Sequence, residues 1–504
     1  MPHHAVEVRG SEDAALTERL AALRVELDLP GGFAAPVLAE AEESAAAVLA
    51  SLGSDAERVD LTAVPFVTVD PSGSTDLDQA LHIAAAEGGR LTVRYAIADV
   101  PAFVAPEGEV DREARRRGQT VYLPDGRVPL HPEVLSEGAA SLLPDVDRPA
   151  FVWTFTLAVD GAVERTALVR SRVRSRAQLT YEQVQAFLDS PDAPEAAAWP
   201  EELRASIALL PEVGRRRTAQ EVARGGASLN MPDQEIHVVD GRYEISQRIP
   251  LQAEDHNAQL SLMTGMEAAR IMLDGGVGVL RTMPAPDTEA VAAFRARTRA
   301  LGHPWEEGAD YGAYLRTVDP REPRHLAVLH AATSLFRGAG YTAFDAEAED
   351  PALRALPANP EQAALAAPYA HATAPLRRLV DRFVLAVCHA LVSGAPVPAW
   401  ARRALPELPA LMQDAGRRAS AADRAAGDLV EAAELSEHVG AELEGVVVRS
   451  GGESADVQLA QPPVAVRVPA AAEPGTRVRI RIDAVDVASG KVTASGVDWP
   501  HSSR

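Results

Sequence analysis

Residues 66–83 read FVTVDPSGSTDLDQALHI: an apolar run, a polar loop and a second short apolar stretch. Between Asp70 and Asp78 the loop holds three acidic residues and two serines within nine positions. Short apolar runs bounded by Pro, Gly and Ser are typical of strands that end in turns. The stretch therefore predicts two strands, with negative charge concentrated in the loop between them.

The residues of this loop allow more than one interpretation. Oxygen-bearing side chains fall at alternate positions from residue 70, as in an EF-hand, but the glycine and glutamate that a calcium loop requires are Thr75 and Leu81 here. We therefore exclude calcium signalling. A solvated polar turn stays open. A Mg2+ site stays open too, because Asp76 and Asp78 project the same way from extended backbone and can converge on a hard cation that binds a substrate phosphate.

Composition limits the class of protein. The chain has 504 residues, of which 47% are hydrophobic and 24% charged, and this predicts a globular protein of roughly two to four domains. Its net charge of -23 would repel nucleic acid at long range. A nucleic-acid partner would therefore need a locally basic surface.

Cysteine usage and hydropathy bear on where the protein works. The one cysteine, Cys388, excludes internal disulfides and thiolate metal clusters and suits a reducing cytosol. The opening MPHHAVEVRG lacks the pattern of a signal peptide, and no apolar run is long enough to span a bilayer. We expect a cytoplasmic monomer with no membrane and no disulfide-linked partner.

The chain is expected to divide into three segments, which gives a multidomain α+β fold. Residues 12–28 and 36–51 carry apolar residues at helical spacing, so residues 1–60 are expected to form a small helical N-terminal domain. A helix-turn-helix is possible there, although an ordinary helical hairpin is commoner. Residues 61–440 mix β-rich stretches with long alanine-rich helices, which indicates one large α+β domain.

The last segment, residues 441–504, consists of short alternating strands separated by Gly, Pro and Ser-Gly. Five such strands in about sixty residues fit a five-stranded OB-fold barrel. Basic residues on these strands suit either single-stranded nucleic acid or a solvated strand face. They are Arg449, Arg467, Arg477, Arg479, Arg481 and Lys491.

Several motifs in a fixed order resemble one enzyme family. The acidic stretch is followed by YAIADVPAFVAPEGEVDREARRRGQTVYLPDG, then by RSRAQLTYEQVQAFL, LQAEDHNAQLSLMTGMEAARIM and YAHATAPLRRLVDRF. Together they resemble the catalytic domain of the ribonuclease II family, the RNB-domain 3′ to 5′ exoribonucleases, over most of residues 61–440. The C-terminal barrel resembles the RNA-binding OB repeat of such enzymes.

This resemblance implies that Asp70, Asp76 and Asp78 form a catalytic, metal-binding acidic centre. The family usually has a fourth aspartate directly after the third, where this chain has Gln79. An amide oxygen can contact a metal or its water but brings no charge, so one or two Mg2+ ions are expected as cofactor. Asp78 is expected to orient or deprotonate the attacking water.

Two adjacent arginines are expected at the start of a helix. Pro375 suits the first turn of a helix that runs to Gly394, and free N–H groups there would form an anion site together with a guanidinium. From the residues alone, an ion pair between Arg377 and Asp381 is the alternative. The resemblance implies that Arg377 is catalytic and that Arg378 is a phosphate or structural contact.

The resemblance also implies a set of RNA contacts. Tyr122 and Tyr181 match aromatic positions that contact the last nucleotides, where stacking needs only a π face. Glu254, rather than its neighbour Asp255, is expected to contact the terminal ribose. His371 lies near the two arginines in sequence and is expected either to contact RNA or to be structural.

We therefore expect a Mg2+-dependent, processive 3′ to 5′ exoribonuclease that degrades single-stranded RNA to nucleoside 5′-monophosphates and a short end product. Three arginine-rich runs, residues 112–118, 170–176 and 214–226, make an electropositive channel possible. Each run alone also fits a solvated helix or strand face, and together with the barrel they favour RNA. Two rivals stay open. One is a protein that binds RNA without cutting it, which Gln79 would explain; the other is a hydrolase of DNA or small nucleotides.

Overall fold

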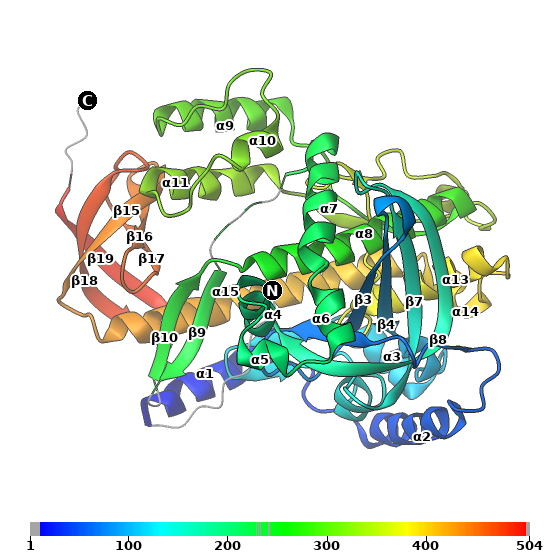
Figure 1. The fold of residues 1–504 in the computed structure, drawn as a ribbon. Helices are drawn as coiled ribbons and strands as arrows, with labels where there is room; N and C mark the ends of the chain where they lie inside the picture. Colours follow the sequence, from blue (N-terminus) through cyan, green and yellow to red (C-terminus); the bar gives the residue numbers. More distant parts are fainter. Residues whose placement is uncertain (1–10, 228, 230, 232, 240–241, 500–504) are drawn as a thin grey trace.

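The strands around the acidic loop belong to one sheet in a computed structural model that describes residues 11–499 apart from 228, 230, 232, 240 and 241 (Figure 1). The loop joins β2 to β3, which pair antiparallel as expected for the two predicted strands. The sheet has the order β1-β8-β2-β3-β4-β7. Its strands are β1 (Val59–Asp60), β2 (Phe66–Asp70), β3 (Gln79–Ala85), β4 (Leu91–Ala98), β7 (Asp147–Leu157) and β8 (Val163–Thr180).

Strand β8 closes this sheet because it pairs with two partners. Its residues 163–174 run antiparallel to β7, and its residues 175–180 run parallel to β2. The ladder β2-β3-β4-β7-β8 therefore returns to its first strand, while β1 pairs with β8 from outside the ring. The acidic loop lies where β2 ends and β3 begins.

Two helices share the core with the sheet: α8 (Gln252–Gly275) and α13 (Leu379–Ser393). They contact each other, and α13 also contacts β8. Side chains of β4 and β7, among them Tyr95 and Trp153, join both helices in one hydrophobic cluster. Every residue of α13 from Leu379 to Cys388 is buried, which is typical of a helix inside a core.

The other elements of this body surround the sheet and these two helices. Three of them, α9 (Thr288–Ala300), α10 (Tyr311–Leu315) and α11 (Pro323–Ala332), have a hydrophobic cluster of their own and lie next to the C-terminal barrel (Figure 1). The rest are α3 (Glu109–Arg117), β5 (Val121–Leu123), β6 (Gly126–Val128), α4 (Tyr181–Asp189), α5 (Pro194–Ala197), α6 (Glu201–Ile207), α7 (Leu210–Arg224), β9 (Asp233–Val239), β10 (Arg242–Arg248), β11 (Val277–Thr282), β12 (Gly340–Asp345), α12 (Pro351–Arg354), β13 (Glu361–Gln362), β14 (Ala367–Pro368) and α14 (Ala399–Ala404).

The long helix α15 (Leu408–Ser436) joins this body to the barrel. Its first turns place Leu408 and Met412 in the main core, and its last turns place Leu429 and Leu435 in the barrel cluster. The barrel strands pair in the order β17-β16-β15-β18-β19, and the end strands β17 and β19 contact each other. The predicted five-stranded barrel is therefore confirmed. Its strands are β15 (Glu442–Gly451), β16 (Ser454–Leu459), β17 (Ala465–Val468), β18 (Arg477–Asp486) and β19 (Lys491–Asp498).

The two predicted N-terminal helices are present as α1 (Ser11–Glu26) and α2 (Ala35–Ser51), but they pack on different parts of the molecule. Leu20 of α1 belongs to the cluster of α15 and the barrel, whereas Val37 of α2 packs with α3 and the π-helical turn Val134–Ala139. Each helix buries its apolar side against the body, so the described residues 11–60 form neither a separate helical domain nor a helix-turn-helix. Residues 1–10 of that predicted domain lie outside the described residues.

The two long helices α8 and α15 carry charged residues along their length. Accordingly, none of the helices that the structure describes is long and apolar enough to cross a bilayer. The Cys388 thiol is buried in α13, where burial raises its pKa.

Gly265, inside α8, marks a close approach of another segment. A Cβ at this position would lie 2.2 Å from Tyr369 Cε2 and 2.5 Å from the carbonyl oxygen of Ala370. The Ala370 N–H donates to the Gly265 carbonyl at 3.0 Å. Residues 369–370, which precede the segment that carries the paired arginines, are therefore held against α8 by backbone contact.

We predict that Gly265→Ala lowers the free energy of unfolding by about 1–3 kcal/mol, because the added methyl group overpacks this contact. Gly427→Ala in α15 is the matched control, since nothing lies within 4 Å of the added Cβ. It is expected to be neutral or to stabilise by up to about 1 kcal/mol. Urea unfolding compares the two, and equal effects would contradict the close approach.

Candidate active site

Two aspartates of the acidic loop lie at the edge of the sheet, Asp78 buried and Asp70 partly buried. Asp70 is the last residue of β2, and Asp78, 3% exposed, directly precedes β3. The Oδ1 atom of Asp78 accepts the Leu376 N–H at 2.8 Å. The Oδ2 atoms of both aspartates are buried without a hydrogen-bond partner. Each carboxylate therefore has one buried oxygen that accepts no hydrogen bond from the protein.

Asp76 has different surroundings. Its Oδ1 accepts a hydrogen bond from Arg127 Nη1 at 2.9 Å, and Tyr122 Oη lies 3.4 Å from its Oδ2. Tyr122 and Arg127 face each other across the β5–β6 hairpin, and Arg127 also donates to Thr75 Oγ1 at 2.8 Å. The hairpin therefore holds Asp76, which leaves Asp70 and Asp78 as the carboxylates with unsatisfied oxygens.

The segment before α13 differs from the prediction. The helix begins at Leu379, not at Pro375, although its end at Gly394 is confirmed. Instead, residues 375–378 run beside the chain that follows α3, where the Thr120 N–H donates to the Arg377 carbonyl at 3.0 Å. This pairing, which includes a β-bridge at residue 378, keeps the four residues out of the helix.

The two arginines of this segment have separate partners. Arg377 Nε lies 3.5 Å from Asp78 Oδ2, next to the buried carboxylate. Arg378 donates to both oxygens of Asp381 at 2.8 and 3.0 Å. An ion pair between Arg377 and Asp381 is therefore not what the structure shows. The expected anion site of free helix N–H groups is wrong as well, because the Ala374 and Leu376 N–H groups donate to carboxylates.

Gln79 ties β3 to the arginine segment. Its Nε2 donates to the Thr373 carbonyl at 2.6 Å, and its Oε1 accepts a hydrogen bond from Tyr95 Oη at 2.6 Å. Ser261 Oγ, on α8, lies within 2.8 Å of Tyr95 Oη. Both ends of the Gln79 amide are thus engaged with protein groups, and its assignment as a metal ligand stays a prediction.

Burial dominates the electrostatics of the two carboxylates. It raises the pKa of Asp70 to about 7, opposed by the charge of Arg377 and reinforced by that of Asp76. Burial likewise raises the pKa of Asp78 well above its usual value, again opposed by Arg377. Both groups would ionise more readily beside an additional positive charge.

The residues fit a divalent cation that takes its remaining ligands from water and substrate rather than from protein side chains. Within the described part of the chain, no group of three or more His, Cys, Asp or Glu side chains is arranged to hold a metal ion. The unsatisfied Oδ2 atoms of Asp70 and Asp78 are nevertheless hard oxygen ligands. Mg2+ commonly binds through one or two carboxylates, completing its shell with waters and substrate phosphate. The arrangement suits such a site and does not suit a closed protein cage.

The two tyrosines predicted to contact RNA, Tyr122 and Tyr181, both lie near the acidic residues. Tyr181 opens α4 as expected and accepts a hydrogen bond from Asn257 Nδ2 at 3.3 Å. Burial and then the charge of Asp70 raise its pKa to about 12. Tyr122 is placed by its contact with Asp76, and burial raises its pKa to about 12. Their stacking on bases stays a prediction.

Glu254 and His371 already have partners within the chain. Glu254 accepts the Leu251 N–H at 2.9 Å at the start of α8 and forms an ion pair with Arg248. His371 Nδ1 lies 2.8 Å from Tyr341 Oη, and its ring packs edge-on against Tyr341 and Tyr369. These contacts favour a structural role for His371. A ribose contact by Glu254 stays a prediction.

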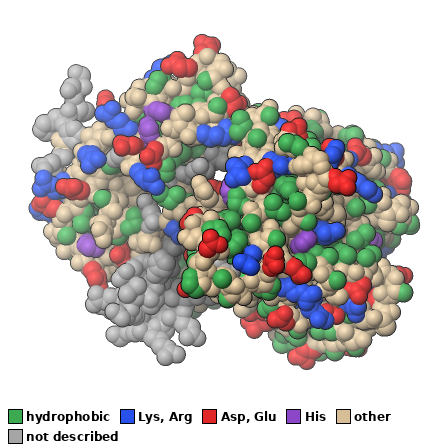
Figure 2. Space-filling view, in the orientation of Figure 1, with side chains coloured by type: hydrophobic (Ala, Val, Ile, Leu, Met, Phe, Trp, Pro, Cys, Tyr) green, Lys and Arg blue, Asp and Glu red, His purple; other side chains and the backbone are tan. Residues whose placement is uncertain are grey.

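An electropositive channel does not follow from the three arginine-rich runs, because most of their guanidinium groups are paired with acidic or carbonyl groups. On the face shown in Figure 2, positive and negative side chains are interspersed. In the barrel, Arg449 pairs with Asp456, and Arg479 and Arg481 pair with Glu442. The pairs within the three runs include Arg112–Glu109, Arg115–Asp111, Arg116–Glu113, Arg117–Glu113, Arg170–Asp99, Arg172–Asp60, Arg174–Asp147, Arg215–Glu212 and Arg216–Glu212.

Sequence reasoning missed three groups of the site: Arg127, Tyr95 and the Leu376 N–H. A signal for Arg127 existed, because YLPDGRV reads as a hairpin whose turn places Tyr122 opposite Arg127. No comparable signal existed for the others. Tyr95 reads as an ordinary strand residue, and a backbone N–H 298 positions away has no sequence signature.

Two family models match this chain. The model described as RNB domain matches residues 58–394, and that of the RNase II-type exonuclease C-terminal S1 domain matches residues 441–497. Exoribonuclease 2 of Photorhabdus laumondii is 39% identical over 164 residues, which are 32% of this chain and 25% of that protein. Ribonuclease R of Vibrio cholerae is 27% identical over 439 residues, 81% of this chain and 50% of that protein. The chain thus spans half or less of the length of these two curated relatives.

Solved structures share the fold. The apo form of Mycoplasma genitalium RNase R superimposes with a TM-score of 0.84 at 18% identity, covering 96% of this chain and 78% of that one. Yeast Ssd1, described as a pseudonuclease, superimposes with a TM-score of 0.65 at 19% identity, covering 85% of this chain and 53% of that one. The same fold therefore occurs in a protein named RNase R and in one described as a pseudonuclease.

We predict that Asp70 makes stability depend on pH in protein kept in EDTA. Its folded pKa of about 7 lies above the ordinary value of 3.8. The stability that the protonated Asp70 carboxyl contributes is therefore fully present below about pH 4 and is lost as pH rises through 7. The shift corresponds to about 4 kcal/mol. In thermal unfolding, Asp70→Asn should gain stability relative to wild type as pH rises from 4 to 8, by up to about this amount.

Mg2+ supplies a second readout for the same substitution. Above pH 7, adding Mg2+ should raise the unfolding temperature of wild type more than that of Asp70→Asn, because only the wild type offers this carboxylate to the cation. A stability difference between the two proteins that is constant from about pH 4 to 8 would contradict the raised pKa.

Gln79→Glu is predicted to destabilise the protein by about 1–3 kcal/mol, because a carboxylate oxygen would then face the Thr373 carbonyl without a donor between them. Gln178→Glu is the matched control. Gln178 Nε2 also donates to a carbonyl, that of Ser74 at 2.7 Å, but on the exposed surface. Water can replace this bond, so little change is expected in urea unfolding. Equal effects of the two substitutions would show that Gln79 does not tie the segments together.

Proposed function

Because the chain belongs to the RNB-domain family of ribonuclease II, we propose that it is a processive, Mg2+-dependent 3′ to 5′ exoribonuclease. It degrades single-stranded RNA, releases nucleoside 5′-monophosphates and stops at a short oligonucleotide. Two relatives named exoribonuclease 2 and ribonuclease R support the reaction. A Mycoplasma genitalium RNase R with the same fold, solved with ribose-methylated single-stranded RNA, supports the substrate.

One observation carries this proposal. Asp70 and Asp78 each present a buried, unsatisfied carboxylate oxygen, and Arg377 lies beside Asp78. Unsatisfied buried oxygens with raised pKa values are unfavourable in a purely structural role and are typical of a site that takes a cation and an anionic substrate. A solvated polar turn, the alternative from sequence, does not bury its carboxylates in this way.

The residues divide the chemistry between them. Asp70 and Asp78 would hold Mg2+, which supplies an activated water and stabilises the leaving oxygen. Asp78, fixed by the Leu376 N–H, orients or deprotonates the attacking water. The Arg377 guanidinium neutralises charge that develops on the scissile phosphate. Tyr122 and Tyr181 stack on the terminal bases, which lets the enzyme accept every base.

RNA binding without cleavage is the second candidate. Gln79 replaces a charge that the family usually has, and the fold also occurs in a protein described as a pseudonuclease. Against this candidate stands the retention of all three aspartates together with Arg377. A DNA or small-nucleotide hydrolase is distinguished by testing whether a 2′-deoxy 3′ end is cleaved or only bound.

We place the enzyme in the cytoplasm as a monomer. The single, buried Cys388 supports a reducing compartment, because nothing in the chain depends on a disulfide.

The test is degradation of a 5′-labelled single-stranded RNA with Mg2+ or with EDTA. We expect Mg2+-dependent collapse to short labelled products in wild type. Asp78→Asn should lose about 10²–10⁴-fold in rate, as expected when a general base is removed. Asp274→Asn, which changes an exposed carboxylate at the end of α8, is the matched control and should retain the wild-type rate.

Intact RNA with wild-type protein and Mg2+, together with a shifted band on a native gel, would replace the exonuclease proposal by the binding protein. Equal rates for Asp78→Asn and Asp274→Asn would show that the cleavage centre lies elsewhere.

A further inference from the structure

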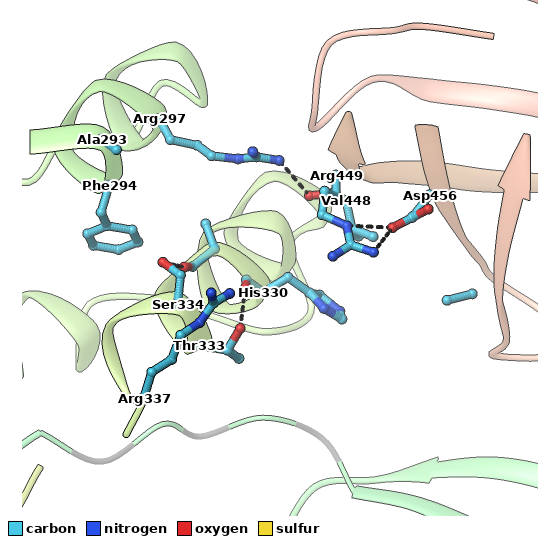
Figure 3. A pocket seen from close by; sticks show the side chains of 12 residues that line it. Ala293, Phe294, Arg297, His330, Thr333, Ser334, Arg337, Val448, Arg449 and Asp456 are labelled. Atoms are coloured by element: carbon cyan, nitrogen blue, oxygen red, sulfur yellow. Dashed lines mark hydrogen bonds and ion pairs between the residues drawn. The ribbon is translucent and has the colours of Figure 1, made fainter. Parts of the chain in front are cut away.

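A pocket lies between the α9–α11 helices and the barrel, on elements that contribute nothing to the acidic centre (Figure 3). Its volume is about 450 Å3, within the range of small-ligand sites. Helix α9 provides Phe294 and Arg297, the chain around the end of α11 provides His330 and Arg337, and β15 provides Arg449. Three cations from three separate segments thus line one space.

The charges in this pocket do not balance. Asp456 is the one acidic residue among its lining groups, and Arg449 already pairs with it through its Nε atom at 2.6 Å. Arg297 donates to the Val448 carbonyl at 3.2 Å, but its Nε is buried without a partner. Among the described residues, neither Arg297 nor Arg337 has a carboxylate partner. Two positive charges therefore face the pocket uncompensated.

The half-buried Arg297 is the more informative of the two. Burial lowers its pKa, and the neighbouring charge of Arg449 lowers it further. A half-buried cation beside a like charge is unfavourable, whereas most arginines in the three basic runs of this acidic chain are paired with carboxylates. Local features that lower stability without a structural gain are expected at functional sites. A bound anion would offset the unfavourable burial of the Arg297 charge beside Arg449.

We propose that this pocket binds phosphate groups of the RNA strand, through Arg297 and Arg337, outside the acidic centre. This inference rests on the proposed function. Guanidinium groups match phosphate geometry and remain charged at any working pH. The barrel wall of the pocket comes from the segment that matches the S1 domain, which favours a nucleic-acid strand over a free small anion.

The test measures RNA binding by the full-length chain carrying Asp78→Asn, so that substrate is not consumed. Arg297→Ala and Arg337→Ala are added singly and together. Arg299→Ala, also on α9 but not among the lining residues, is the matched control. Because Arg297 also contacts the barrel backbone, Arg337→Ala on the exposed side keeps the test valid if Arg297→Ala folds poorly.

For a long RNA, we expect the double variant to lose about tenfold in affinity and its log–log salt slope to become shallower by about 1.4, the value for two lost phosphate contacts on a single strand. A very short RNA that fills only the acidic centre should bind all variants equally. Arg299→Ala should match the parent with both RNAs.

Two results would overturn the inference. One is equal long-RNA affinity and salt slope for the Arg297/Arg337 double variant and for Arg299→Ala. The other is calorimetric binding of inorganic phosphate or a nucleoside 5′-monophosphate that Arg337→Ala abolishes while long-RNA affinity is unchanged, which would identify a small-anion site. Mg2+-dependent cleavage of the short RNA, measured with Asp78 intact, tests the proposed function independently of either result.

Discussion

The hydrogen bond from the Leu376 N–H to the buried carboxylate of Asp78 is the constraint on which the site depends. It joins the acidic loop to a segment 298 positions further along the chain, and the same segment places Arg377 beside the other carboxylate oxygen. Gly265 lets residues 369–370, a few positions earlier, run against α8, and Gln79 joins the chain at Thr373 to β3 through the Thr373 carbonyl. The sheet, one core helix and the arginine segment thus fix the position of one negative charge.

Burying carboxylates here raises their pKa values and leaves two oxygens unsatisfied. This local loss of stability is offset by the packed core around it, in which α13 is buried on every side. An apolar framework of this kind can hold charged groups in an arrangement that they would not adopt by themselves. It also buries Asp78, and the low dielectric around a buried carboxylate strengthens its interaction with any cation that enters.

The sequence predicted those parts of the protein that depend on local pattern. Alternation and turn residues indicated β2, β3 and the five-strand barrel, and helical spacing indicated α1 and α2. Prediction from the sequence failed where contacts with segments far along the chain determine the structure. The start of α13 moved from Pro375 to Leu379 because Thr120 pairs with the chain there, and α1 and α2 separate because each packs on the body. The arginine runs looked like an RNA surface, yet most of their guanidinium groups are paired. Some partners lie one turn away on the same helix, as Glu113 does for Arg117, whereas others, such as Asp99 for Arg170, lie far away in sequence.

The measurement that tests the central claim most directly is a crystal structure of the Asp78→Asn protein with Mg2+ and a short RNA. The account predicts that the 3′-terminal phosphodiester lies between Asp70 and Arg377, that the last bases lie near Tyr122 and Tyr181, and that Asp70 would help to hold the cation. An RNA 3′ end bound away from the acidic loop, or a phosphate there that Arg377 does not contact, would contradict it.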